Sequence, residues 1–202
     1  MLPRPASIFD TLQVATTGAP PPLGKGAGQL YIVVRSFKTP KGDMGPAALL
    51  IKEKKRGVWG PPGGLTDVTD HSPLHAALRE FEEEVGADWR NLANAAESFQ
   101  IVRIMPGGPQ KSEAWMMLVD LDASEAETAL FGEDRSGWSL EKRMMPTTPL
   151  SNEAIGYAFV TLDALANADV NTGAFKIRNH TQTLRHVGYT RPQAKMILMR
   201  LK

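Results

Sequence analysis

Hydrophobic residues recur along the chain in several short runs that are typical of β-strands. The predicted strands cover residues 30–37, 47–52, 99–105, 114–120 and 157–162. These runs are rich in β-branched and other apolar side chains, and glycine and proline gather between several of them. Strands interrupted by a few helices predict a layered α/β architecture.

A different period predicts a helix over residues 73–85, because apolar side chains recur there every three to four positions. At about 100° per residue, these side chains share one face. They are Leu74, Ala77, Leu78, Phe81 and Val85. Ser72 is a favourable N-cap, and Gly86 suits a left-handed end. A second helix is predicted over 161–168, and weaker patterns indicate helices over 181–187 and 192–201.

Glu80, Glu83 and Glu84 fall on an arc of the 73–85 helix roughly opposite the apolar face. Three neighbouring carboxylates repel one another, so at least one should have a raised pKa without a cation. A hard divalent ion such as Mg²⁺ prefers oxygen ligands and would relieve this repulsion. The simple alternative is a solvated helix face that carries several glutamates.

The sequence around these carboxylates resembles a known family. Residues 79–87 read Arg-Glu-Phe-Glu-Glu-Glu-Val-Gly-Ala and resemble the second half of the Nudix box, Arg-Glu-U-x-Glu-Glu-x-Gly-U, in which U is apolar. Residues 58–64 resemble the strand and loop that precede the box in many members. The full pattern places a glutamate between Gly64 and Arg79, where this chain has Asp70 or His71 and one extra residue.

The resemblance implies an α/β Nudix fold, in which a mixed β-sheet lies between helices. It implies metal-dependent hydrolysis, with Mg²⁺ or Mn²⁺, of a diphosphate linkage in a small nucleotide substrate such as a nucleotide sugar, ADP-ribose or a dinucleotide. The expected metal ligands are the carboxylates of Glu80, Glu83 and Glu84 and the carbonyl of Gly64. Arg79 would orient a carboxylate, and Asp70 would support Arg79 if the loop bulges. Many relatives are dimers, so a homodimer is an option.

The general base has more than one candidate. In the family this carboxylate comes either from the box helix or from a distant loop. The candidates are therefore Glu83 and Glu84 on the helix, and Glu153, which lies just before the predicted strand at 157–162. A solvated loop position is the plain alternative for Glu153.

Three aromatic residues, Phe99, Trp138 and Tyr157, are candidates for stacking on a base or ring of the substrate, with a place in the core as the alternative. The chain has no acidic residue after Asp169 but several lysines and arginines. A basic region of this kind can bind phosphates, and an RNA 5′ end is therefore an alternative substrate. A catalytically weak binding module of the same fold is a further alternative, supported only by the departure at Asp70 and His71.

The composition indicates how the chain is organised and excludes several classes of protein and site. Residues 1–26 are rich in proline and glycine and are predicted to form an arm, and residues 27–202 form the predicted domain, with an insertion near 123–150 and a basic C-terminal region. The formal net charge is +1, which disfavours a protein that coats nucleic acid, and the absence of cysteine excludes thiolate metal sites and thiol catalysis. No apolar run approaches the roughly 18 residues of a membrane span, and no signal peptide is evident, so we expect a cytoplasmic protein.

Overall fold

The computed structural model describes residues 26–39, 42–105, 113–132, 154–177 and 180–202. Nearly all of the predicted arm therefore lies outside the described residues, and so does the part of the predicted insertion after residue 132. No helix in the described part of the chain has the length and apolar character needed to cross a membrane.

One mixed sheet forms the centre of the molecule, in the strand order β5-β4-β1-β8-β7, with β6 added to β1 and β9 to β4. Its strands are β1 (Ala27–Ser36), β4 (Ala47–Glu53), β5 (Trp59–Gly60), β6 (Gly63–Leu65), β7 (Phe99–Met105), β8 (Glu113–Asp122) and β9 (Ala154–Thr161). The β1–β8 pair is parallel, whereas the other pairs of this sheet are antiparallel. Two small hairpins lie outside the sheet. They are β2 (Lys38–Thr39) with β3 (Gly42–Asp43), and β10 (Ala174–Ile177) with β11 (His180–Thr183).

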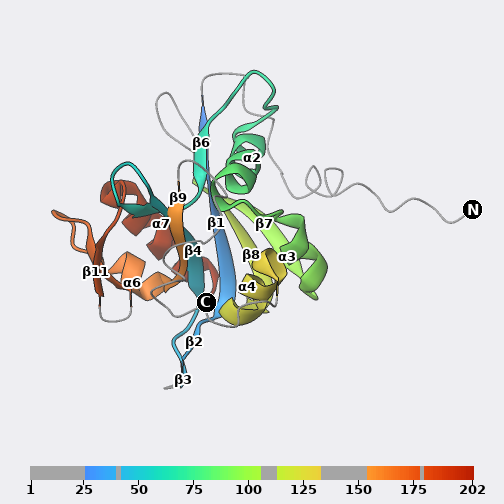
Figure 1. The fold of residues 1–202 in the computed structure, drawn as a ribbon. Coiled ribbons are helices and arrows are strands. Elements are labelled where there is room, and N and C mark those ends of the chain that lie inside the picture. The colour runs from blue at the N-terminus through green and yellow to red at the C-terminus, as the bar shows by residue number, and fades with distance from the viewer. Residues whose placement is uncertain (1–25, 40–41, 106–112, 133–153, 178–179) are drawn as a thin grey trace, which may run out of the picture.

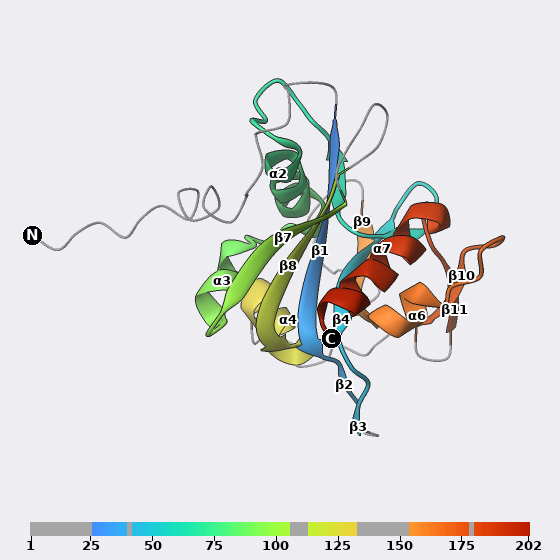
Figure 2. The ribbon, with the colours of Figure 1, turned by 180° about the vertical axis from the view of Figure 1, so that it is seen from behind.

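Helices cover both faces of the sheet. The helices are α2 (Pro73–Val85), α3 (Arg90–Ala95), α4 (Ala123–Phe131), α6 (Leu162–Ala166) and α7 (Val187–Arg200). Helices α2, α3 and α4 lie on one side, and α6 and α7 lie on the other together with the β10–β11 hairpin (Figures 1 and 2). The expected α/β fold, a mixed sheet between helical layers, is confirmed.

Strand β1 contributes to two separate hydrophobic cores because its side chains alternate between the two faces of the sheet. Leu30 and Ile32 belong to the core beneath α2, α3 and α4. Tyr31 and Val33 belong to the core beneath α6 and α7. All four side chains are fully buried, so β1 has no solvent-exposed face along this stretch and its register is fixed from both sides.

Helix α2 begins and ends as its sequence predicts. The Ser72 hydroxyl accepts a hydrogen bond from the backbone N–H of His75 at 3.1 Å. Pro73 occupies the first turn, where its missing N–H costs nothing. Gly86 adopts φ 69° and ψ 26°, the left-handed conformation that ends a helix, and its N–H donates to the Glu82 carbonyl.

Some sequence-based expectations for the remaining elements were wrong. Residues 123–131 form helix α4, not irregular chain, because Asp122 and Glu125 make a reciprocal capping box. The helix predicted over 181–187 is replaced in part by strand β11, which gains main-chain hydrogen bonds by pairing with β10. The helix predicted from residue 192 begins earlier, at Val187, and α3 was not predicted.

Candidate active site

The three box carboxylates occupy different environments on α2. Glu83 is exposed and Glu80 is half-buried, whereas Glu84 is buried at 8 % exposure. The expectation that all three lie opposite the apolar face was therefore wrong for Glu84, which borders that face. Burial of Glu84 brings its carboxylate against the chain segment that precedes the helix.

That segment is the glycine pair Gly63 and Gly64 on β6. The Gly63 N–H donates to Glu84 Oε2 at 2.8 Å. At Gly64, a Cβ atom would lie 2.4 Å from the carboxyl carbon of Glu80, a distance that real Cβ contacts do not reach. A side chain at position 64 would therefore displace the Glu80 carboxylate, which fills the space beside Gly64.

Arg79 connects the carboxylates to the loop. Its guanidinium donates to Asp70 Oδ2 at 3.1 Å, to Glu80 Oε1 at 2.9 Å and to Glu83 Oε2 at 2.9 Å. The hydrogen bond to Asp70 is the main reason that the pKa of Arg79 is raised above its ordinary value, although burial opposes the shift. Charge-assisted bonds of this kind hold both partners in defined positions.

Asp70 takes the place of the glutamate that the family pattern expects. Its side chain is fully buried, and it accepts from the Asp67 N–H at 2.8 Å as well as from Arg79. Burial raises the pKa of Asp70, but the hydrogen bonds from Arg79 and Asp67 outweigh it, so the pKa lies below its ordinary value. His71 is instead exposed and stacks on His75. The extra loop residue thus brings Asp70, not His71, to Arg79.

The predicted metal ligands agree with a divalent cation in their chemistry. Among the residues that the structure describes, no three His, Asp or Glu side chains are gathered closely enough to hold a metal ion. Arg79 engages Glu80 and Glu83, and the Gly63 amide engages Glu84. Nevertheless, these side chains and the Gly64 carbonyl offer oxygen donors only, which are the ligands that a hard divalent cation prefers. The chemistry of the donor set therefore fits such a cation.

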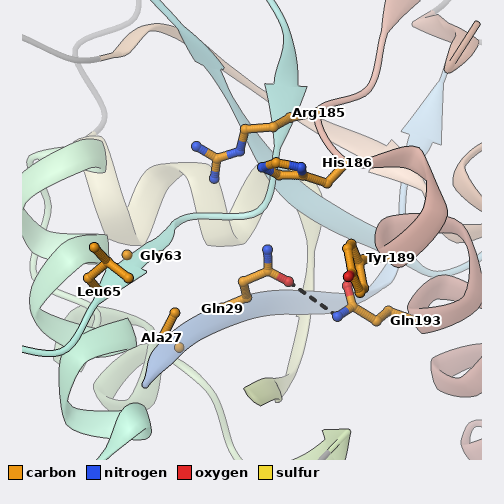
Figure 3. A pocket seen from close by; sticks show the side chains of 10 residues that line it. Ala27, Gln29, Gly63, Leu65, Arg185, His186, Tyr189 and Gln193 are labelled. Atoms are coloured by element: carbon orange, nitrogen blue, oxygen red, sulfur yellow. Dashed lines mark hydrogen bonds between the residues drawn. The ribbon is translucent and has the colours of Figure 1, made fainter. Parts of the chain in front are cut away.

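A cavity of about 310 Å³ opens beside this loop. Ala27, Gly28, Gln29, Gly63, Gly64 and Leu65 line it on the side of β1 and β6, and Arg185, His186, Tyr189 and Gln193 line it on the side of α7. Figure 3 shows Arg185 and His186 on the side opposite Gln29, with the open space between them. The glycine loop of the box and the C-terminal helix thus share one cavity.

Arg185 is fixed in the wall of this cavity. Its backbone N–H donates to the Trp59 carbonyl at 2.6 Å, and its guanidinium donates to the Pro61 carbonyl at 3.1 Å. His186 follows as the N-cap residue of α7, and its φ of 51° is left-handed. Burial, and then the charge of Arg185, lower the pKa of His186 below its ordinary value. This wall therefore offers a permanent cation beside a neutral imidazole.

Other basic residues of the C-terminal region have structural partners. Arg191 donates to the Ala166 carbonyl at 3.0 Å, at the end of α6. Lys176 donates to the Thr181 hydroxyl across the β10–β11 hairpin. The lopsided charge of this region is thus used in part within the fold, and Arg185 is its contribution to the cavity.

The aromatic residues predicted to contact substrate lie away from this cavity. Tyr157 is 4 % exposed and stacks on Phe131 at 4.2 Å between ring centres, within the core beneath α2. Phe99 lies on β7 and lines a second cavity with Arg35 and Leu201. Trp138 and Glu153 lie outside the described residues.

Sequence analysis missed four side chains that line the cavity: Gln29, His186, Tyr189 and Gln193. Tyr189 and Gln193 are four positions apart on α7, which is the spacing of neighbours on one helix face. That signal was hidden because the helix was predicted to begin only at residue 192.

The NUDIX domain family profile matches residues 31–180. Among curated proteins, none matches the sequence. The chain is similar to the solved structure of a C. elegans Ap4A hydrolase binary complex, with 15 % identity, a TM-score of 0.48, and coverage of 87 % of this chain and 97 % of that chain. It is also similar to a mutT/nudix family protein from Listeria innocua (12 % identity, TM-score 0.47, coverage 91 % and 96 %). A third similar structure is the Nudix hydrolase RenU from M. smegmatis (16 % identity, TM-score 0.46, coverage 88 % and 87 %).

The profile match is the decisive comparison because it covers most of the chain and spans β1 to the β10–β11 hairpin. It includes the whole glycine loop and the whole of α2, where Arg79 and the three box carboxylates lie. We therefore conclude that this chain belongs to the NUDIX domain family of pyrophosphohydrolases.

Proposed function

We propose that this chain hydrolyses a diphosphate linkage in a nucleoside diphosphate joined to a second small group, with a divalent cation as cofactor. The observation that carries the proposal is the shared cavity, in which the glycines beside the box carboxylates face the Arg185 wall. A volume of about 310 Å³ lies at the lower end of ordinary ligand sites, which span roughly 300–1,000 Å³. Nucleotide sugars, ADP-ribose and dinucleotides are the substrate types that we favour.

Glu80, Glu83, Glu84 and the Gly64 carbonyl would hold the cation. When bound, a Mg²⁺ or Mn²⁺ ion neutralises phosphate charge and lowers the pKa of a bound water. Arg79 keeps Glu80 and Glu83 at fixed positions, and Asp70 keeps Arg79 in place. Arg185 is available to pair with a phosphate oxygen on the opposite side of the cavity.

The chemical step needs a carboxylate that takes a proton from the attacking water. The water oxygen forms a bond to phosphorus, the bridging P–O bond breaks, and the departing phosphate carries the electron pair away. Glu83 and Glu84 are the candidate bases on α2, and Glu153 is the candidate on the chain before β9. Glu83 is exposed and accepts a hydrogen bond from Arg79, whereas Glu84 is buried and accepts the Gly63 N–H, so Glu83 is the more accessible of the two helix carboxylates.

The test is a substrate panel measured with Mg²⁺ and with Mn²⁺. It contains ADP-ribose, NADH, nucleotide sugars, dinucleoside polyphosphates, nucleoside triphosphates and capped RNA. We expect turnover of a compound with two linked small groups, and a loss of about 100-fold or more in kcat for Glu83→Gln, as for other groups that stabilise transition-state charge. Glu82→Gln is the matched control, because Glu82 lies on the same helix but pairs with Arg90 at 3.1 Å.

Each alternative has its own outcome in this panel. Turnover of capped RNA alone would replace the proposal with an RNA 5′-end hydrolase. A folded protein that turns over nothing would favour a binding module. The departure from the box pattern no longer supports that last alternative, because Asp70 already occupies the supporting position beside Arg79.

A further inference from the structure

Three polar side chains form a continuous hydrogen-bonded chain from the core to the cavity. The Tyr31 hydroxyl donates to Gln193 Oε1 at 2.5 Å, and Gln193 Nε2 donates to Gln29 Oε1 at 3.2 Å. Tyr31 is 0 % exposed and Gln193 is 1 % exposed, whereas Gln29 is half-buried at the edge of the cavity. Figure 3 shows the bond that joins Gln193 to Gln29.

The direction of this chain follows from the partners of the Gln193 amide. Burial raises the pKa of Tyr31 above its ordinary value, so the phenol stays protonated and remains a donor. The Tyr31 hydroxyl donates to the oxygen of the Gln193 amide, and the Gln193 nitrogen faces two acceptors, Gln29 Oε1 at 3.2 Å and Met105 Sδ at 4.0 Å. The Gln29 oxygen must then face Gln193.

The consequence is a fixed donor in the cavity. With its oxygen committed to Gln193, the Gln29 amide has its nitrogen left to face the open space, where Figure 3 places it toward Arg185 and His186. An amide that was free to rotate could offer either a donor or an acceptor. This one is held as a donor, because reversing it would set two N–H groups against each other within the Gln193–Gln29 pair.

The neighbours of Gln29 fit a nucleoside. Tyr189 is 50 % exposed and lines the same cavity, so its ring is accessible for stacking on a base. Arg185 lines the same space and suits a phosphate. The cavity volume of about 310 Å³ lies within the range of small-ligand sites, roughly 300–1,000 Å³.

We infer that this cavity binds the nucleobase of the substrate and selects bases that present a carbonyl oxygen to the Gln29 amide nitrogen. Guanine and uracil carry an oxygen acceptor where adenine and cytosine carry an amino donor. A base with an amino group at this position would face a second donor and leave both groups unpaired. The inference rests on the proposed function and names its substrate class, a guanosine or uridine diphosphate linked to a second group.

The experiment measures binding without catalysis. The full chain is titrated calorimetrically with GMP, AMP, UMP and CMP in the presence of EDTA, so that each pair compares an oxygen with an amino group on a base of the same size. We expect the keto nucleotide of each pair to bind about tenfold more tightly or better, because an unpaired polar group in a binding site is costly.

Gln29→Glu is the decisive variant. One carboxylate oxygen still accepts from Gln193, and the other presents an acceptor to the cavity. The added charge weakens the binding of every nucleotide. The ratio of affinities within each pair, GMP to AMP and UMP to CMP, should nevertheless reverse in favour of AMP and CMP. Gln100→Glu makes the same change at an exposed position on β7 and should leave the ratios unchanged.

Tyr31→Phe tests the positioning role of the buried end. Removing the phenol hydroxyl releases the Gln193 amide, so that Gln29 can present either its amide oxygen or its amide nitrogen to the cavity. Both ratios of nucleotide affinities should then fall toward one. This readout separates positioning from a loss of packing, which would weaken both members of a pair alike. Circular dichroism verifies that the variant is folded.

The following results would overturn the inference: equal affinities within both pairs, preference for AMP and CMP in the wild type, ratios unmoved by Gln29→Glu, or no binding of any nucleotide. The failure of the proposed function is a separate result, because it requires the absence of turnover across the hydrolysis panel. A chain that hydrolyses its substrate without base preference would keep the proposed function and lose this inference.

Discussion

The box helix α2 and the α7 wall of the cavity are built from the chain in contrasting ways. Around α2, Arg79 contacts Asp70, Glu80 and Glu83, which lie at most nine positions away along the chain. On the α7 wall, Arg185 contacts Pro61 at a separation of 124 positions, and Gln193 contacts Gln29 at a separation of 164. The contacts around α2 are arranged by one helix and its loop, whereas the α7 wall exists only when the two ends of the domain meet.

This difference has a kinetic meaning under the proposed function. The charges of α2 would surround the site of bond breaking, so changes there should lower kcat. The α7 wall would bind parts of the substrate that do not react, so changes there should raise KM or alter selectivity while kcat is kept.

The largest effect is expected for Gly64→Ala. The new Cβ would lie 2.4 Å from the Glu80 carboxyl carbon, so the carboxylate has to leave its position. We expect kcat to fall by about 100-fold or more, as for loss of a group that stabilises transition-state charge. Gly188→Ala, on α7 with no atom within 4 Å of the new Cβ, is the control and should retain normal turnover. Equal kcat for both variants would contradict the assignment of Glu80.

The next effect is expected for Asp70→Asn. The neutral amide weakens the support of Arg79, which then holds Glu80 and Glu83 less firmly. Residues that support a metal ligand typically contribute about 10- to 100-fold to activity, so kcat should fall within that range. Asp67→Asn is a useful comparison, because the Asp67 carboxylate bonds to Thr69 and not to Arg79.

The same variant should change acid stability. The pKa of Asp70 in the folded chain lies below its ordinary value of 3.8, so its ionised form stabilises the fold above that pH. This contribution is lost as the pH falls through the folded pKa. Chemical unfolding of wild type and Asp70→Asn should therefore differ most at neutral pH and converge toward pH 2. A constant difference over this range would exclude the linkage.

On the α7 wall, Arg185→Gln should raise KM by about tenfold and leave kcat within a factor of two, because it removes a charge-assisted contact to a non-reacting phosphate. The KM of the variant should also depend less on salt than that of wild type. Arg200→Gln, at the exposed end of α7, is the matched charge change and should alter neither constant. A fall in kcat for Arg185→Gln would instead place Arg185 among the groups that act at bond breaking.

The smallest effect concerns how the two helices begin. Helix α2 has a side-chain cap from Ser72, whereas α7 begins at His186 without one. Ser72→Ala should lower the free energy of unfolding by about 1 kcal/mol, a typical cost of losing an N-cap. Ser124→Ala, at an exposed position in the first turn of α4, should cost much less in the same denaturant titration.

The sequence predicted the structure correctly where residues close together in the chain determine it. The bounds predicted for 73–85 and 99–105 agree with α2 and β7, because a capped amphipathic helix and an apolar run between turns carry their own signals. The cap at Ser72 and the stop at Gly86 were predicted for the same reason. The role of Asp70 was predicted only as one option, since the loop path that brings it to Arg79 depends on tertiary contacts.

The sequence was misleading where distant segments decide the outcome. Tyr157 is a plausible stacking residue by type, but it packs beside Phe131 in the core. Gln29 and Gln193 have no unusual local pattern, and their hydrogen bond joins positions that lie 164 residues apart along the chain. The strand at 180–183 forms because β10 supplies its hydrogen-bond partners, which no local propensity reveals.

The alternation of β1 has an evolutionary consequence. Gly28 packs beneath the backbone of α2, and the very next residue, Gln29, faces α7. Adjacent codons of one strand therefore serve the face that carries the box helix and the face that carries α7. Under the proposed function, mutations confined to the α7 face would exchange one nucleotide preference for another while the box helix is inherited unchanged. A scaffold of this kind would diversify its substrates without rebuilding its chemistry.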